Sequence, residues 1–161
     1  YADPGQSKKG AKNRLMFYLG VDPGAHGGFA VMQDGIIVTY MAFDKPEFVN
    51  CIDYLSRQQE KTKCCLEKVH AMPKQGSVSM FNFGVSYGWL KGVLDAKEIA
   101  YQEIPPQTWK KEFGLNSKKE KSIEVCRQLF PEANLVPHNH RTAHDGIAEA
   151  LLMAEYARRK L

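Results

Sequence analysis

Four carboxylates occupy positions in this chain where an acidic side chain is unfavourable unless it meets a cation. Asp22 ends an apolar run and precedes a glycine-rich turn, and Glu67 lies within a second apolar segment. Asp145 and Glu149 are four residues apart, so a helix would place them on one face. Carboxylate oxygens alone suit magnesium or manganese, and not zinc or copper. Two such ions roughly 3.5 to 4 Å apart would clamp the attacking and leaving oxygens of a phosphodiester.

The segment around Asp22 also fits two other structures. An ordinary hairpin would use this aspartate to cap its turn, and that interpretation would be preferred if Asp22 stood alone. The pattern Asp-x-Gly after a first strand also resembles the phosphate-binding turn of actin-like and sugar-kinase ATPases. That architecture needs two such domains around a nucleotide, and 161 residues are too few for it. We therefore expect no nucleotide cofactor.

The first part of the chain predicts three strands joined by tight turns, because short apolar runs alternate with glycine-containing breaks. Asp34-Gly35 is a strong hairpin signal between the second and third strands. The three strands should form an antiparallel meander, with Asp22 at the rim of a buried sheet. They are expected over residues 15–22, 29–33 and 36–42.

A helix is expected to follow, since Pro46 suits a first helical turn and four apolar residues share one face. A short fourth strand over 64–69 comes after it. A right-handed crossover would lay that strand parallel to the first and beside it, which brings Glu67 to the same rim as Asp22. Two adjacent cysteines and Leu66 indicate a strand covered on both faces, against the alternative of an exposed edge strand. The four apolar helix residues are Phe48, Val49, Ile52 and Leu55.

A second helix, over 80–96, carries three glycines along one face, and each costs about 1 kcal/mol of helix propensity relative to alanine. Close approach of another element would offset this cost, either by packing on the molecule's own sheet or in a dimer seam, and the sequence favours neither. A fifth strand over 99–104 ends at Pro105-Pro106. Two helices are expected after it, over 117–130, with Ser117 and Glu120 as a capping box, and over 142–160.

The composition predicts a single domain without a membrane-spanning segment. Residues 1–13 are small and polar without periodicity, so we expect a disordered tail before one domain over 14–161. No apolar run is long enough to span a membrane, and no signal peptide is visible. The formal charge of +4 is only a weak indication of a polyanionic partner. The cysteines lack zinc spacing and predict buried free thiols in a reducing compartment: Cys51, Cys64, Cys65 and Cys126.

Three acidic motifs, in this order, resemble the RuvC family of Holliday-junction resolvases, within the ribonuclease-H-like nucleases. The motifs are GVDPG at 20–24, CLEKV at 65–69 and HDGIAEALLMAEYA at 144–157. PPQTWKK at 105–111 and KEKSIEV at 119–125 match the family's proline-led strand end and basic helix. The resemblance covers most of the chain and is closest to phage and organellar members. It implies an α/β fold with a five-stranded mixed sheet in the order 3-2-1-4-5, flanked by helices.

The resemblance also implies a metal-dependent endonuclease that cuts a four-way DNA junction by paired symmetric nicks, one from each subunit of a homodimer. Lys121 matches a basic residue close to the scissile phosphate. His144 is an alternative to Glu149 for completing the second metal site. The acids that match the ligands of two magnesium or manganese ions are Asp22, Glu67, Asp145 and Glu149.

The loop after Glu67 matches the segment that enters the junction core, where family members often carry an aromatic wedge. His70 stands at that position here, and Phe81 and Phe83 further along can also stack on a base. The expected DNA-binding residues are His70, Met72, Lys74, Gln75, Phe81, Lys110, Lys111, Lys118 and Lys119. The dimer interface is expected at Gly84, Gly88 and Gly92.

Two other functions keep parts of this pattern. A ribonuclease-H-like nuclease that acts on RNA or on other branched DNA would keep the acids without needing the glycine-lined helix. A junction-binding protein without catalysis would keep the basic surface, and the full set of acids argues against it. Bacterial or phage cytoplasm and an organelle are all compatible compartments.

Overall fold

The computed structural model describes residues 15–70, 76–116 and 118–161. The predicted tail over 1–13 lies outside the described residues. Three predicted DNA-binding residues and one side chain also lie outside them: Met72, Lys74, Gln75 and the side chain of Lys119. Among the helices of the described ranges, none is both long and apolar enough to cross a membrane.

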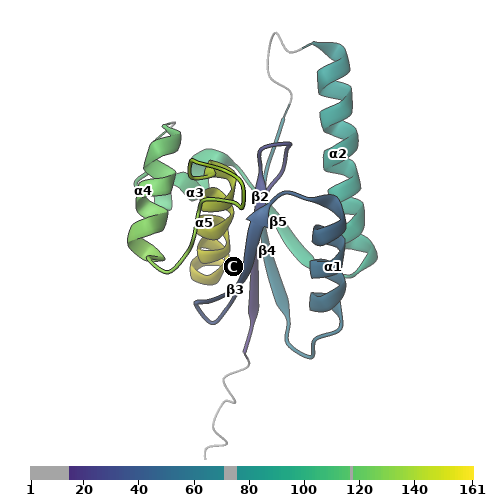
Figure 1. Cartoon of the computed structure of the whole chain (residues 1–161). Helices are drawn as coiled ribbons and strands as arrows, with labels where there is room; N and C mark the ends of the chain where they lie inside the picture. Colours follow the sequence, from purple (N-terminus) through teal and green to yellow (C-terminus); the bar gives the residue numbers. More distant parts are fainter. Residues whose placement is uncertain (1–14, 71–75, 117) are drawn as a thin grey trace, which may run out of the picture.

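A five-stranded mixed sheet forms the centre of the molecule (Figure 1). Its strand order is β3-β2-β1-β4-β5, which confirms the prediction. β1 pairs antiparallel with β2, and β2 with β3, whereas β1, β4 and β5 run parallel to one another. The strands are β1 (Phe17–Asp22), β2 (Gly28–Gln33), β3 (Ile36–Ala42), β4 (Thr62–Glu67) and β5 (Ala100–Ile104).

The predicted turns and strand interiors account for this sheet. Asp34 and Gly35 both have positive φ, 49° and 88°, as the central residues of a type I′ hairpin turn do. β4 lies two residues earlier than predicted, and it is an inner strand between β1 and β5. The cysteines are free thiols as predicted, although Cys51 is only partly buried.

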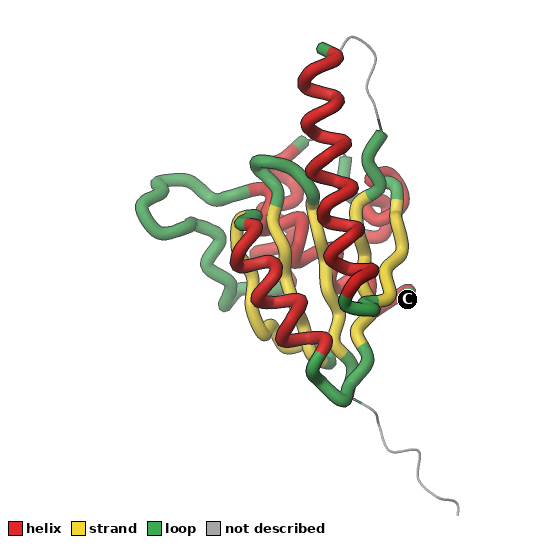
Figure 2. Tube along the Cα trace, turned by 90° about the vertical axis from the view of Figure 1, so that its right-hand side faces the viewer, coloured by secondary structure: helices red, strands yellow, loops and turns green. Residues whose placement is uncertain are grey.

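Helices cover both faces of the sheet (Figure 1). α1 and α2 cross one face, as Figure 2 shows, and pack on alternate β1 side chains, namely Phe17, Leu19 and Val21. α3, α4 and α5 cover the opposite face. The helices are α1 (Lys45–Ser56), α2 (Ser77–Ala96), α3 (Pro106–Glu112), α4 (Lys119–Leu129) and α5 (Asp145–Lys160).

α1 begins where the sequence predicts, because Asp44 caps it. The Asp44 carboxylate accepts a hydrogen bond from the backbone N–H of Glu47 at 3.1 Å. The prediction for Val49 was wrong, since this residue is 38% exposed. It lies beside the stripe that faces the sheet. The residues of that stripe that are buried as predicted are Phe48, Ile52 and Leu55.

The later helices differ from the prediction mainly at their starts. The sequence does not predict α3, because seven residues give too few turns for a periodic pattern, and Pro106 only marks its first turn. α4 begins two residues later than predicted, and its capping box depends on Ser117, which lies outside the described residues. α5 begins at Asp145 because the His144 side chain caps it, accepting a hydrogen bond from the backbone N–H of Ile147 at 3.3 Å.

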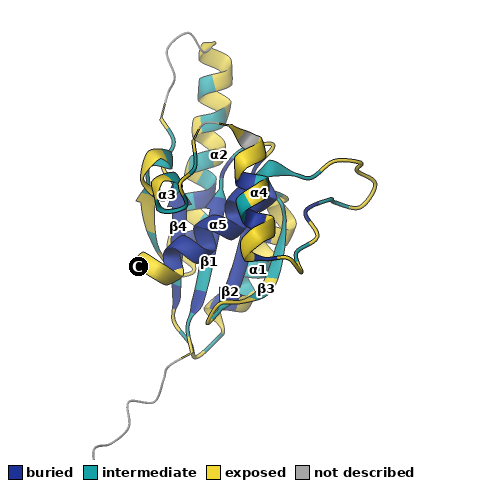
Figure 3. Ribbon diagram, turned by 90° about the vertical axis from the view of Figure 1, so that its left-hand side faces the viewer, coloured by how far each residue is buried: buried dark blue, intermediate teal, exposed yellow. Residues whose placement is uncertain are grey.

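α5 is buried around its whole circumference over most of its length (Figure 3). Every residue from Gly146 to Ala157 is buried, whereas the sequence predicts one apolar face. The difference arises because one side of α5 packs on β1 and β2 while α4 packs on another side. α5 is therefore the central helix of this layer.

Two glycines allow α5 to lie directly on the sheet. A Cβ at Gly20 of β1 would collide with the backbone of Ala150 and Ala154. A Cβ at Gly146 would collide with the backbone of Gly27 in the β1–β2 turn. Because glycine has no side chain at these two positions, the helix and the strand approach closely, and this approach determines how far apart their acidic residues lie.

The glycines of α2 do not have this role. A Cβ at Gly84, Gly88 or Gly92 would meet no atom within 4 Å, so the alternative of packing on the molecule's own sheet was wrong. In Figure 1 one end of α2 projects past the sheet. Its outer face combines the glycines with apolar side chains that are 55% to 72% exposed. We define the outer face of α2 as Val78, Phe81, Gly84, Val85, Gly88 and Gly92.

Replacement of Gly20 by alanine is expected to lower the free energy of unfolding by about 1–3 kcal/mol, since an added methyl group forces backbone shifts in a packed layer. Urea denaturation followed by circular dichroism measures this change. Gly76→Ser is the matched control, because a Cβ at Gly76 meets no atom within 4 Å and serine is a preferred N-cap residue. Equal denaturation midpoints for Gly20→Ala and wild type would contradict the close contact.

Candidate active site

Asp22 and Glu67 end neighbouring parallel strands at the same edge of the sheet. Val21 of β1 pairs with Leu66 of β4, so the two acids follow side by side. Val21 and Leu66 belong to the core under α1 and α2. Because successive side chains of a strand point to opposite faces, both acids face the layer of α5.

α5 brings the other two predicted acids to this edge. Asp145 is its first residue, and the close contact of Gly146 with the β1–β2 turn seats this end of the helix. Glu149 lies one turn further on and is 8% exposed. The charges of Glu67, Glu149 and Asp145 all act on Asp22. The four acids predicted from the sequence are therefore brought together.

Burial and the neighbouring carboxylates make Asp22 and Glu67 hard to ionise. Burial is the largest cause of the raised pKa of Asp22, and the neighbouring carboxylates raise it further. Burial is also the main cause of the raised pKa of Glu67. Lys110 acts in the opposite direction on both groups. Concentrated negative charge of this kind is a property of sites that hold divalent cations.

Helix α3 contributes two contacts to the acids that the sequence analysis missed. Trp109 is fully buried, and its Nε1 donates a hydrogen bond to Glu67 Oε2 at 2.9 Å. Lys110, predicted to bind DNA, has its Nζ 3.0 Å from Glu149 Oε1. The same Nζ lies 5.2 Å from the centre of the Trp109 ring. The sequence contains one signal for this role of Trp109. A single tryptophan inside a lysine-rich segment indicates a side chain that is buried beneath a charged surface.

Helix α4 supplies another missed residue. The buried Ser122 hydroxyl donates a hydrogen bond to Glu149 Oε1 at 3.0 Å. Glu149 therefore has a hydroxyl and an ammonium as partners, which satisfies a carboxylate that has little access to water. Ser122 lies four residues before the buried Cys126, so the helical spacing placed it on the inner face.

The donor chemistry of the site fits a hard divalent ion such as Mg²⁺ or Mn²⁺. All four acids offer oxygen, and Asp22 and Glu67 have raised pKa values that a nearby dication would lower. Among the described residues, no group of three or more His, Cys, Asp or Glu side chains is placed to hold one metal ion. His144, the alternative ligand, uses its Nδ1 to cap α5.

The other predicted site residues within the described ranges are exposed to solvent. Lys121 has a side chain 52% exposed, and its Nζ is 3.3 Å from Glu124 Oε2. The structure leaves a further set of predicted DNA-binding residues exposed to solvent: His70, Phe81, Lys111 and Lys118.

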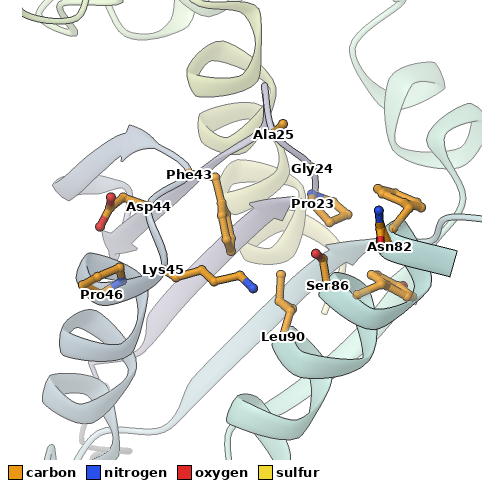
Figure 4. A pocket seen from close by; sticks show the side chains of 12 residues that line it. Pro23, Gly24, Ala25, Phe43, Asp44, Lys45, Pro46, Asn82, Ser86 and Leu90 are labelled. Atoms are coloured by element: carbon orange, nitrogen blue, oxygen red, sulfur yellow. The ribbon is translucent and has the colours of Figure 1, made fainter. Parts of the chain in front are cut away.

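Two cavities open near this end of the sheet. The smaller, about 300 Å³, is lined by Glu67, His70 and Phe83. The larger, about 540 Å³, lies between the β1–β2 turn, the start of α1 and α2 (Figure 4). Phe83 lines both cavities, and Lys45 extends into the larger one. Of these two cavities, only the smaller is lined by one of the four acids, Glu67.

No protein-family model matches the chain, and no curated protein matches its sequence significantly. Two solved structures match over most of it. RuvC of T. thermophilus in complex with a Holliday junction substrate shares 13% identity, with a TM-score of 0.58, over 90% of this chain and 97% of that one. Thermus thermophilus RuvC shares 17% identity, with a TM-score of 0.55, over 89% and 96%. The fold is RuvC-like. The RuvC-like architecture confirms the ribonuclease-H-like sheet predicted from the acidic motifs.

Replacement of Asp22 by asparagine is expected to stabilise the metal-free protein, increasingly so as the pH rises above about 4, the ordinary pKa of an aspartate carboxyl. The pKa of Asp22 is raised in the folded state, so the stability linked to its proton is present at low pH. That stability is lost as the pH rises through the folded pKa. The amide has no proton to lose. Thermal denaturation in EDTA measures the difference in Tm.

Asp53→Asn is the matched control with the opposite sign. A hydrogen bond from Lys97 is the main cause that lowers the pKa of Asp53, so its stabilising contribution is present above the unfolded pKa and is lost as the pH falls. This variant should have a slightly lower Tm than wild type near neutral pH. A Tm for Asp22→Asn below that of wild type would mean that Asp22 is a structural residue.

Proposed function

We propose that this chain is a metal-dependent, structure-selective endonuclease that resolves four-way DNA junctions by paired symmetric nicks. The observation that supports the proposal is the meeting of four carboxylates from β1, β4 and α5 on a RuvC-like fold. One of the similar structures is RuvC in complex with a Holliday junction substrate. The four acids would hold the divalent ions needed to hydrolyse a phosphodiester of such a substrate.

The site would hold two Mg²⁺ or Mn²⁺ ions. When bound, such ions lower the pKa of an attacking water and stabilise the leaving oxygen of a phosphodiester. The chain's own residues orient the ligands beforehand, since Trp109 holds Glu67 and Ser122 holds Glu149. The proposed ligands are Asp22, Glu67, Asp145 and Glu149.

Two lysines have different proposed roles. Lys110 balances part of the negative charge at Glu149 through their ion pair. Lys121 would leave its exposed ion pair with Glu124 and offset the charge that develops on the phosphorane.

The DNA would lie across the sheet edge that carries the acids. His70 lines the small cavity beside Glu67, from where its ring could stack on an unpaired base of the junction. Phe81, exposed on α2, is a second stacking candidate. The lysines would contact phosphates without reading sequence. The remaining proposed DNA contacts are Met72, Lys74, Gln75, Lys111, Lys118 and Lys119.

A homodimer is part of the proposal, because paired nicks need two sites. The outer face of α2 supports it, since glycines on one helical face permit close approach of a second helix. Two exposed apolar side chains, Val78 and Val85, flank the glycines. Removing them from water on association would stabilise the dimer.

Replacing any of the four acids with its amide is expected to abolish cleavage while junction binding survives. The test compares a labelled synthetic four-way junction with a linear duplex of the same sequence, with and without magnesium. Wild type should make symmetric paired nicks in the junction alone. Asp53→Asn serves as the control, since Asp53 lies on α1 and pairs with Lys97 and Arg57 away from the acids.

Each other outcome contradicts part of the proposal. Binding without cutting by wild type, in both magnesium and manganese, would indicate a junction-binding protein. Equal cutting of both substrates, or cutting of RNA, would indicate another ribonuclease-H-like nuclease. Retained nicking by Asp22→Asn would contradict the proposal that the four acids are required for cleavage.

Replacement of Gly88 by leucine is expected to convert the dimer to monomer, because the added side chain prevents the helices from approaching along the outer face of α2. Sedimentation equilibrium measures the mass, and the cleavage assay should show loss of the second nick. Asn50→Leu, an exposed helical position on α1, is the control and should leave the mass unchanged. A monomeric wild-type protein would contradict the proposed dimer interface at the outer face of α2.

A further inference from the structure

The last turn of α5 carries a network of charges that no sequence motif explains. Glu155 is 5% exposed and accepts hydrogen bonds from Arg158 Nε and Nη2, both at 2.8 Å, and from Arg159 Nε at 2.7 Å. Burial alone would raise the pKa of Glu155, and the two arginines hold it below its ordinary value. Because Glu155 is buried and bonded to both guanidinium groups, Arg159 has a fixed position.

This network extends to α3 through Glu112. Arg159 Nη1 lies 3.5 Å from Glu112 Oε1, and Lys160 Nζ lies 3.1 Å from Glu112 Oε2. The guanidinium of Arg159 also lies over the ring of Phe113, 5.1 Å from its centre. Two residues at the end of α3 are therefore attached to the end of α5.

α3 is the helix that holds two of the acids from outside the sheet. Trp109 bonds to Glu67, and Lys110 pairs with Glu149, so the orientation of this helix determines both contacts. A helix of seven residues is not stable by itself, so its orientation depends on tertiary contacts. The Pro105-Pro106 pair restrains its first turn, and Glu112 restrains its last.

We propose that Glu112, held by Arg159 and Lys160, is a positioning residue that fixes α3 so that Trp109 and Lys110 stay on Glu67 and Glu149. The ion pairs of the Glu112 carboxylate are with Arg159 and Lys160, so we infer that it acts on the acids through the helix. Its effect on cleavage rests on the proposed nuclease function, whereas its effect on α3 does not.

The first test measures how firmly Trp109 is held. The chain has two tryptophans, so Trp89→Phe leaves Trp109 as the single tryptophan, whose fluorescence can be excited selectively. In that background, Glu112→Gln should raise the acrylamide quenching constant about twofold or more, because α3 opens more often. Lys160→Gln, which removes one of the two ion pairs, should give a smaller rise. Asp53→Asn breaks exposed ion pairs on α1 and should give none.

Salt gives an independent readout. Since the pairs of Glu112 are partly exposed, raising the ionic strength should raise quenching in the Trp89→Phe protein and leave Trp89→Phe/Glu112→Gln nearly unchanged. Glu112→Asp, which keeps the charge, should restore much of the protection. Equal quenching in all variants, with retained circular dichroism, would overturn the proposal.

The catalytic consequence is tested separately. Glu112→Gln should lower kcat on the four-way junction about tenfold and leave KM unchanged, since small displacements of groups at a reacting centre reduce rate more than binding. Increased quenching with an unchanged kcat would overturn a role for α3 in catalysis. If wild type cuts no junction, the nuclease proposal fails, and the quenching and salt data still decide whether Glu112 holds α3.

Discussion

The close packing of α5 on β1 and on the β1–β2 turn, at two glycines, is the constraint on which the rest of the structure depends. Gly20 and Gly146 let the helix backbone reach the sheet where any larger residue would collide. That approach brings the first two turns of α5 to the ends of β1 and β4, and with them the four acids. The two buried cores, one on each face of the sheet, fill the space around this contact.

The acids in turn explain why α3 and α4 lie where they do. Burial and the repulsion between neighbouring carboxylates are unfavourable for charged side chains, and the raised pKa values of Asp22 and Glu67 record that energy. Trp109, Lys110 and Ser122 reduce it with a hydrogen bond, a charge and a hydroxyl, from α3 and α4. These two helices surround the site in addition to completing the core.

Much of the fold could be predicted because its signals are local. The hairpin at Asp34-Gly35, the periodic strands and the handedness of the crossover are enough to place Asp22 beside Glu67. α3 could not be predicted, since a helix of two turns is defined by what it packs on. The same holds for Lys110: a lysine in a basic run looks like a surface charge until the fold brings Glu149 to it. Val49 was misplaced because helical periodicity does not fix the exact width of a buried stripe.

The distance in sequence between Asp22 and Asp145 has a consequence for biosynthesis. A growing chain contains β1 and β4 long before it contains α5, so the acidic site cannot exist on a partly made polypeptide. Until α5 arrives, the sheet face that it covers, including Ala30, Met32 and Cys65, has no partner helix. Contacts this far apart in sequence also form slowly. The emerging chain therefore depends on α5 to cover this face of the sheet as well as to complete its site.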